Sequence, residues 1–404
     1  MPEQLALVGG AIYVSPGETI AGGVVLIEAG TIAAVGRRGE VPVPEGVPAI
    51  DCTGLAVSAG FWNCHVHFFE RKWANAGEIP AAELERQLRE MLTRFGFTSV
   101  FDTGSDWANT RRIRERIESA EVAGPRIRST GPGLVPPGAL PSDTVLAMMG
   151  VMRFPAPEVA DAAQSRAAAR ALLEEGVDGI KVFASSPRSA AMSEETMRAA
   201  ADEARLAGKP SFVHPNSAAD VLTAVRSGVE ILAHTTPHSG PWDEALLAAM
   251  HEQRVALTPT LTLWRYYARH DRVSAQDRIA ETACGQLRMW AESGGAVLFG
   301  TDLGAVEYDP REEYALMARA GLGLREVLAS LTVAPAERFG EVARRGRVAA
   351  GYVADLAVWK PSEDGDPRSL ADIRYTLRGG KIVYQPVILS ELHSRCAGEV
   401  ILEN

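Results

Sequence analysis

The sequence predicts an α/β protein in which a (β/α)8 TIM barrel carries a small β-sandwich domain formed by the N- and C-terminal segments. In the middle of the chain, short apolar runs alternate with longer amphipathic stretches, which is typical of βα units around a parallel sheet. Both ends instead hold apolar, β-branched runs around glycine turns, which indicate β-hairpins. We therefore expect residues 1–58 and 336–404 to form the small domain, with a tail, and residues 59–335 the barrel.

The hairpin signals are clearest near the two ends of the chain. Residues 5–14 surround Gly9-Gly10, and residues 23–36 surround Ala29-Gly30. Near the other end, the runs 373–377 and 381–384 flank Gly379-Gly380. Two β-rich ends around a different middle favour a single sheet domain in which the ends of the chain meet.

Eight candidate strands divide the middle of the chain. They are residues 60–68, 98–104, 125–131, 179–185, 210–216, 229–235, 255–261 and 296–302. Between the fourth and the fifth, Ser193 is placed to cap a helix that runs to Leu206, and Gly208 is placed to end it. Eight βα repeats match the count and size of a (β/α)8 barrel. An open doubly wound sheet is the alternative, but the glycine-rich dinucleotide fingerprint expected after its first strand is missing.

The net charge and composition argue against several classes of protein. The formal net charge of −10 and the lack of a basic stripe argue against a nucleic-acid partner. The four cysteines are scattered without a C-x-x-C pair, which argues against a disulfide framework and fits a reducing cytoplasm. We see no signal peptide and no apolar run of the roughly 18 residues that would cross a bilayer. We expect a cytoplasmic protein with a small-molecule substrate, and its oligomeric state stays open between monomer and homo-oligomer.

Two histidines lie close together in the first barrel strand. Residues in a strand alternate between faces, so His65 and His67 point the same way. Imidazole is the commonest protein ligand for zinc and similar ions. Two core histidines bonded to carbonyl groups are the alternative for this pair alone.

Four further polar residues lie in or at the ends of later strands. They are Lys181, His214, His234 and Asp302, on the fourth, fifth, sixth and eighth strands. In a barrel the active site lies where the strands end, and an unpaired charge inside an apolar run would cost several kcal/mol. Each residue alone has an ordinary structural explanation, but six such positions together predict one site.

This pattern of residues resembles the metal-dependent amidohydrolase superfamily, particularly its imidazolonepropionase-related members and the bacterial Xaa-Pro and Xaa-Arg dipeptidases. The β-rich ends resemble the composite sheet domain of many members. The resemblance implies two divalent ions, with His65, His67 and Asp302 at one, His214 and His234 at the other, and Lys181 bridging them. An ammonium has no lone pair to bind a metal, so the resemblance implies N6-carboxylysine at Lys181. Zinc is expected, with iron, manganese or cobalt as alternatives.

The implied reaction is hydrolysis of a carbon–nitrogen amide bond in a cyclic amide, an N-acyl amino acid or a dipeptide. A hydroxide bridging the two ions would attack the carbonyl, and Asp302 would act as the catalytic base and then as the acid. Deaminase members and imidazolonepropionase typically carry a glutamate three residues after the fifth-strand histidine, whereas this chain has Ser217 there. The dipeptidases often place a histidine after strand three, and residues 129–133 have none. The alternatives are a one-metal deaminase with unmodified Lys181, and a metal-free scaffold.

Other residues are weaker candidates, because each could equally be a loop or helix residue. The candidates for substrate binding are His238, Arg265, Tyr266 and Tyr267, and Arg71 and Trp73 could line the same mouth. We read His251, His270 and His393 as surface or structural residues.

Overall fold

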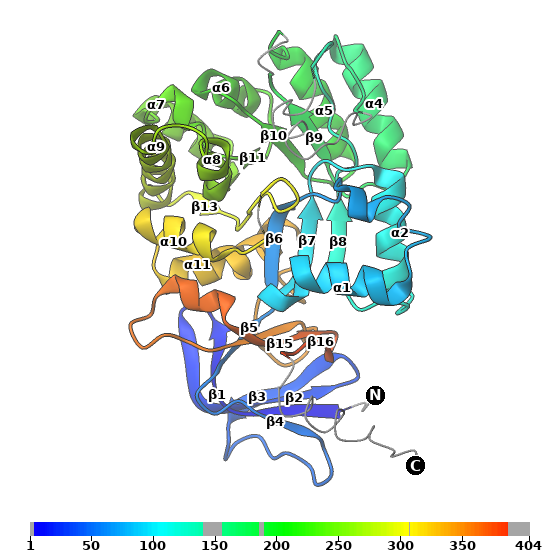
Figure 1. The fold of residues 1–404 in the computed structure, drawn as a ribbon, viewed down its shortest axis with the longest axis vertical. Helices are drawn as coiled ribbons and strands as arrows, with labels where there is room; N and C mark the ends of the chain where they lie inside the picture. Colours follow the sequence, from blue (N-terminus) through cyan, green and yellow to red (C-terminus); the bar gives the residue numbers. More distant parts are fainter. Residues whose placement is uncertain (1–3, 140–155, 186–189, 307, 387–404) are drawn as a thin grey trace, which may run out of the picture.

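The computed structural model describes residues 4–139, 156–185, 190–306 and 308–386. An α/β body with parallel strands and surrounding helices occupies the upper part of Figure 1, and a β-rich domain lies below it. His393 lies outside the described residues. Within them, no helix combines the length and the apolar content needed to cross a membrane.

Strands from both ends of the chain share one sheet of eight strands, in the order β16-β15-β14-β5-β1-β2-β3 with β4 beside β1. The join is β5 with β14, where Ala59 pairs with Leu356 in antiparallel register. The bounds are β1 Gln4–Ser15, β2 Glu18–Glu28, β3 Thr31–Arg37, β4 Ala49–Asp51, β5 Ala56–Ala59, β14 Leu356–Trp359, β15 Ile373–Arg378 and β16 Lys381–Tyr384. The sandwich arrangement and the domain boundaries stay predictions.

The body holds eight parallel strands in two sheets, β6-β7-β8 and β13-β12-β11-β10-β9. The bounds are β6 Phe61–Val66, β7 Phe97–Asp102, β8 Arg126–Ser129, β9 Ile180–Phe183, β10 Ser211–His214, β11 Ile231–Ala233, β12 Ala256–Thr258 and β13 Ala296–Val297. Each lies in its expected range, except that β7 begins one residue early. The expectation of a strand over 296–302 is wrong after residue 297. There the chain turns towards β6, and the backbone N–H of Asp302 donates to the carbonyl of His65 at 2.9 Å.

Two seams separate the sheets. At one, the N–H of Cys64 donates to the carbonyl of Phe299 at 2.7 Å. At the other, Leu134 bridges to Val182 outside the named strands. The ladder is not continuous across either seam, so the structure shows an α/β fold with parallel sheets but not the closed barrel that the sequence predicts.

The helix predicted after the fourth barrel strand is confirmed. Helix α5 spans Glu194–Leu206, the Ser193 hydroxyl accepts from the N–H of Thr196, and Gly208 follows with φ +65°. The other α-helices are α1 Ala81–Met91, α2 Trp107–Glu118, α4 Ala162–Glu174, α6 Ala218–Arg226, α7 Glu244–Glu252, α8 Leu261–Tyr267, α9 Val273–Glu292, α10 Arg311–Arg319, α11 Leu324–Leu331 and α12 Val333–Arg338. Short 3-10 turns are η1 Arg71–Trp73, η2 Thr93–Phe95, η3 Pro237–Ser239 and η4 Pro367–Ala371.

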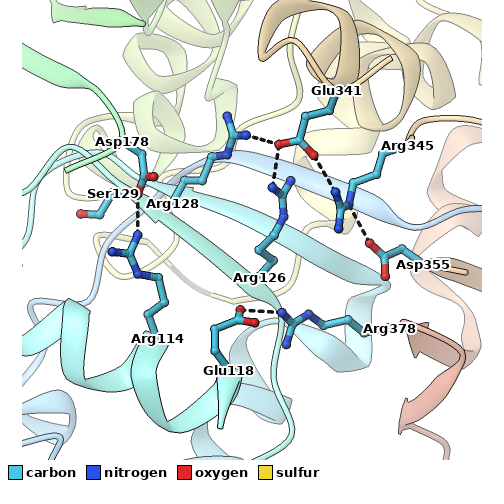
Figure 2. Close-up of polar contacts among 10 residues, drawn as sticks. All are labelled: Arg114, Glu118, Arg126, Arg128, Ser129, Asp178, Glu341, Arg345, Asp355 and Arg378. Atoms are coloured by element: carbon cyan, nitrogen blue, oxygen red, sulfur yellow. Dashed lines mark hydrogen bonds and ion pairs between the residues drawn. The ribbon is translucent and has the colours of Figure 1, made fainter. Parts of the chain in front are cut away.

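The amino end of the parallel strands is closed by aromatic packing and an ion-pair network. Phe339 stacks on Trp62 with ring centroids 5.4 Å apart. Figure 2 shows the carboxylate of Glu341 between three guanidinium groups. One of these groups also forms an ion pair with a carboxylate that directly precedes β14 of the small sheet. The partners of Glu341 are Arg126, Arg128 and Arg345, and Arg345 also pairs with Asp355. This end of the body therefore provides stability and leaves the opposite end for chemistry.

Candidate metal centre

Five of the six polar residues predicted from the sequence lie at or beyond the carboxyl ends of the parallel strands, and Lys181 lies inside its strand. His65 lies in β6, Lys181 in β9 and His214 at the end of β10, while His67, His234 and Asp302 follow β6, β11 and β13. Five of them are less than a tenth exposed, and His214 is partly exposed. Since parallel strands end at the same edge, their side chains are brought into one region.

Three ligand atoms converge most tightly. The Nε2 atoms of His65 and His67 lie 3.3 Å apart, and Oδ1 of Asp302 lies 3.1 Å from the first and 2.8 Å from the second. These residues form a buried group suited to hold a metal ion. In a tetrahedral zinc site with Zn–N bonds of about 2.1 Å, ligand atoms lie about 3.4 Å apart. The spacing of the three atoms therefore fits a divalent cation.

The two imidazoles do not behave as ordinary core histidines. The Nδ1 atoms of His65 and His67 are buried, and neither has a hydrogen-bond partner within the described residues. A structural histidine would normally satisfy a ring nitrogen with a backbone carbonyl or a hydroxyl group. The Nε2 atoms of both rings face Oδ1 of Asp302, so they are the atoms placed to bind a metal ion.

His234 and His214 extend the group away from β6. The His234 ring centroid lies 4.6 Å from that of His65 and 4.6 Å from that of His214. The ring of Phe183 lies 5.2 Å from His214 and closes that side. Four imidazoles thus form a continuous row from β6 to β10.

Burial keeps these imidazoles neutral, which is the form that binds metals. Burial, followed by the positive charge of Lys181, lowers the pKa of His65 to about 3 and that of His214 to about 4. Burial, with His214 and His65 nearby, also lowers the pKa of His234 well below its ordinary value. The site therefore presents nitrogen lone pairs at neutral pH.

The two charged members have shifted pKa values as well. Burial lowers the pKa of Lys181 to about 7, against the attraction of Asp302 and Asp102. Burial opposes ionisation of Asp302, but its electrostatic interaction with His65 and hydrogen bonds from His65 and His67 hold the pKa of Asp302 well below its ordinary value. A neutral amine and an ionised carboxylate therefore coexist at neutral pH.

The backbone is strained at the strand ends. His234 has φ +88° and Asp302 has φ +64°, values that non-glycine residues rarely adopt. Gly304 has φ +102°, and a Cβ added there would lie 2.4 Å from the carbonyl oxygen of His67. Such conformations persist only where the surrounding structure enforces them, and they cluster at functional sites.

The weaker candidates for substrate binding differ in their burial and in their contacts. His238 is exposed, with its ring 5.6 Å from Trp264, and Arg265 forms an ion pair with Glu312. Tyr266 is partly buried and Tyr267 exposed, and substrate binding by all four candidates stays a prediction. Exposed His251 and His270 are consistent with surface positions, and for Arg71, which is also exposed, a place at the mouth stays a prediction.

One expectation for the mouth is wrong. Trp73 is fully buried, packs edge-on against Phe68 with centroids 5.2 Å apart, and donates to Glu70 at 3.1 Å. Its large apolar ring contributes more by packing in the core than by facing an open surface.

Asp102 was not singled out by the sequence analysis. It ends β7, is fully buried, and accepts hydrogen bonds from the hydroxyls of Ser105 at 2.5 Å, Ser129 at 2.8 Å and Thr110 at 3.0 Å. Its charge acts on Lys181, and burial raises its pKa. The signal was present, because Asp102 is a carboxylate at the end of an apolar run.

The chain is similar to known proteins over most of its length. The model of the amidohydrolase family matches residues 56–387. The chain is similar to a prolidase crystallised with N-methylphosphonate-L-proline, at 27% identity and a TM-score of 0.76, over 95% of this chain and 100% of that chain. It is also similar to a Xaa-Pro dipeptidase with bound methionine (20%, TM-score 0.77, 95% and 100% covered) and to A. niger ochratoxinase (20%, 0.77, 96% and 96%). These last two likenesses show the fold alone.

A shorter likeness involves the amidohydrolase tasK of Hapsidospora irregularis, with 34% identity over 84 residues. It spans 20% of this chain and only 8% of that protein. The family match is far more extensive, because it covers most of the chain. The chain therefore belongs to the amidohydrolase family.

Proposed function

We propose that this chain is a metal-dependent hydrolase that cleaves a carbon–nitrogen amide bond in a small molecule. The observation that carries the proposal is the convergence of His65 Nε2, His67 Nε2 and Asp302 Oδ1 at one buried point. Family membership and the prolidase likeness support the coarser statement, hydrolysis of a carbon–nitrogen bond.

Two divalent ions fit the donor set. His65, His67 and Asp302 would hold one, His214 and His234 the other, with Lys181 between them. When bound, such ions would act as Lewis acids that polarise the scissile carbonyl and lower the pKa of water. Neutral imidazoles and an ionised carboxylate are the forms in which these side chains bind cations.

Lys181 is proposed to be carboxylated. With a pKa near 7, about half of its side chains carry a neutral amine at pH 7. The amine nitrogen can then attack carbon dioxide, so that an N–C bond forms and one proton is released. The resulting carbamate is anionic and has two oxygen atoms, which suits it to bridge two cations.

Asp302 is proposed to move the proton. Its carboxylate stays ionised at neutral pH and lies against His65 and His67, so it can accept the proton that the attacking water loses. The same carboxyl group would then deliver the proton to the leaving nitrogen. Its strained backbone conformation holds the carboxylate in one place.

The substrate is proposed to be a dipeptide, with an N-acyl amino acid or a cyclic amide as the other members of the same class. The similarity to a prolidase that was crystallised with a proline derivative makes dipeptides ending in proline the first choice. The specificity of such sites depends on loops at the strand ends rather than on the fold.

The test combines metal analysis with hydrolytic screening of the purified chain. We expect about two divalent ions per chain by mass spectrometry, and hydrolysis of at least one dipeptide, N-acyl amino acid or cyclic amide. Removal of the metal by a chelator should abolish the activity, and zinc, manganese or cobalt should restore it. One ion with deamination of an aromatic amine would favour the deaminase alternative, and a chain that binds no metal would contradict the proposal.

A further inference from the structure

His234 has a second contact that the metal centre does not explain. Its Nδ1 atom lies 2.6 Å from the hydroxyl oxygen of Thr260, and that hydroxyl also lies 2.9 Å from the carbonyl oxygen of Pro259. The hydroxyl has one hydrogen, and the carbonyl can only accept. For both contacts to be hydrogen bonds, Thr260 must donate to Pro259 and accept from Nδ1–H of His234. This arrangement fixes the tautomer of His234 and leaves the lone pair on its Nε2 atom.

Thr260 is itself held in an unfavourable conformation. Its φ of +45° is in the left-handed region, which a β-branched residue rarely adopts. It directly precedes helix α8, and it is fully buried. Some other interaction must therefore keep Thr260 in place.

Glu313 of α10 supplies that interaction. Its carboxylate accepts hydrogen bonds from the N–H of Leu261, the N–H of Thr262 and the hydroxyl of Thr262, each at 2.8 Å. These are donors of the first turn of α8, which has no side-chain cap of its own from Thr260. Glu313 is fully buried, and its burial raises its pKa to about 7 against these hydrogen bonds. Burial of the Glu313 carboxyl group is energetically costly. Unlike an exposed serine cap, this group holds the first turn of α8 to another helix, α10.

Helix α8 also contacts the neighbourhood of His234 from its other side. The indole Nε1–H of Trp264 donates to the hydroxyl of Thr235 at 2.9 Å, and its ring lies 6.4 Å from that of His234. The first turn of α8 is thus fixed both to α10 and to the segment that carries His234. Any shift of this turn would move the Thr260 hydroxyl relative to the imidazole.

We propose that Thr260 and Glu313 are positioning residues: Thr260 fixes the tautomer and ring orientation of His234, and Glu313 fixes Thr260 by holding the first turn of α8. The inference depends on the proposed role of His234 as a metal ligand. Neither residue is one of the proposed metal ligands. Partners of this kind typically change metal affinity by 10- to 100-fold.

The experiment compares Thr260→Val, which keeps the shape and removes the hydroxyl, with Thr260→Ser, which keeps the hydroxyl. Metal-free protein is titrated with Zn2+ alone against a competing chelator. We expect Thr260→Val to bind the zinc proposed at His214 and His234 about 10- to 100-fold less tightly, and Thr260→Ser to stay near wild type. Thr282→Val, whose hydroxyl bonds only to a carbonyl of its own helix, is the control and should bind zinc as wild type does.

A second readout reports the tautomer directly. In histidine-labelled metal-free protein, the 15N shifts of His234 should show hydrogen on Nδ1 in the wild type and a larger share on Nε2 in Thr260→Val. A purely structural role would change thermal stability without changing the tautomer. Unchanged shifts and unchanged zinc affinity in Thr260→Val would overturn the role of Thr260.

Glu313→Gln tests the other half of the proposal and also serves if Thr260→Val does not fold. Its amide can accept fewer of the three hydrogen bonds, so we expect weaker zinc binding in the same direction. Wild-type affinity in this variant would overturn the role of Glu313. A wild-type chain that binds no zinc would instead contradict the proposed function, so the two failures are distinguishable.

Discussion

Lys181 illustrates how burial changes the chemistry of one side chain. An exposed lysine has a pKa near 10.4 and would be neutral in only about one molecule in a thousand at pH 7. In the structure, burial lowers the pKa of Lys181 to about 7, although two carboxylates nearby oppose this shift. The reactive neutral amine is therefore a product of the tertiary environment, while the residue type is encoded in the strand.

Replacing Lys181 by alanine should remove the proposed bridge. We expect Lys181→Ala to bind fewer than two metal ions and to lose more than about 100-fold in activity, because a bridging ligand matters at least as much as residues that only orient ligands. Metal content and kcat/KM are measured on the same preparation. Lys381→Ala, at an exposed position of β16, is the control. A fully active Lys181→Ala protein that holds both metals would refute the bridging role.

Gly304 tests the close approach of the loop after β13 to His67. In Gly304→Ala, the new Cβ would meet the His67 carbonyl at 2.4 Å, so the loop must move and carry Asp302 with it. We expect lower metal content and lower activity in this variant. The matched control is Gly321→Ala, because Gly321 has a similar φ of +98° but no atom within 4 Å of an added Cβ. Equal metal content in both variants would show that the close approach is not needed.

At the scale of elements, the helices around the parallel strands begin and end at capping groups, and each of these can be tested separately. Helix α5 begins at a serine cap and ends before a glycine in the left-handed conformation. Helix α8 has no such cap, and a carboxylate from α10 takes over that task. A cap supplied by a neighbouring residue, as at α5, can be predicted from the local sequence. A cap supplied by a distant helix, as at α8, cannot.

Ser193→Ala should lower the free energy of unfolding by about 1 kcal/mol, the usual value for loss of an N-cap. The N–H of Thr196 would lose its hydroxyl partner, while the metal centre should keep its metal. Urea unfolding followed by circular dichroism measures the change. Ser193→Asp restores an acceptor and should recover most of the stability. A loss in Ser193→Asp as large as in Ser193→Ala would count against capping as the cause.

At the scale of the whole molecule, Glu341 connects the amino end of the body to the small sheet. It is the shared carboxylate of Arg126, Arg128 and Arg345 (Figure 2), and its side chain is only 11% exposed. Removing its charge would leave Arg126 and Arg128 without a counter-ion among the described residues, beside Arg345, which keeps Asp355. Two largely buried guanidinium groups without a counter-ion cost much more than the loss of an exposed pair.

We therefore expect Glu341→Gln to lower the free energy of unfolding by about 3 kcal/mol. The control is Glu118→Gln, which breaks the more exposed pair with Arg378 and should cost less than about 1 kcal/mol. Both are measured by urea denaturation at low and high salt. Similar small losses in the two variants would show that the network contributes little.

The strands could be located from the sequence, because an apolar run between turn residues is a local signal. Six polar residues were predicted in or at the ends of strands, and the structure brings those side chains into one region. The position of Trp73 was predicted wrongly, since an aromatic residue after a strand can face either the mouth or the core. The last strand was predicted too long, because the turn at Asp302 depends on a backbone hydrogen bond to His65, which is 237 positions earlier in the chain.

By itself, the sequence determined which polar side chains lie in or after the parallel strands, since this follows from residue type and local periodicity. Only the tertiary structure decided that burial would bring Lys181 close to neutrality, that Thr260 would fix the tautomer of His234, and that Glu313 would hold Thr260 from another helix. These features depend on contacts between distant segments and on backbone conformations that the isolated residues disfavour. Such contacts exist only after the chain has packed, and no local pattern encodes them.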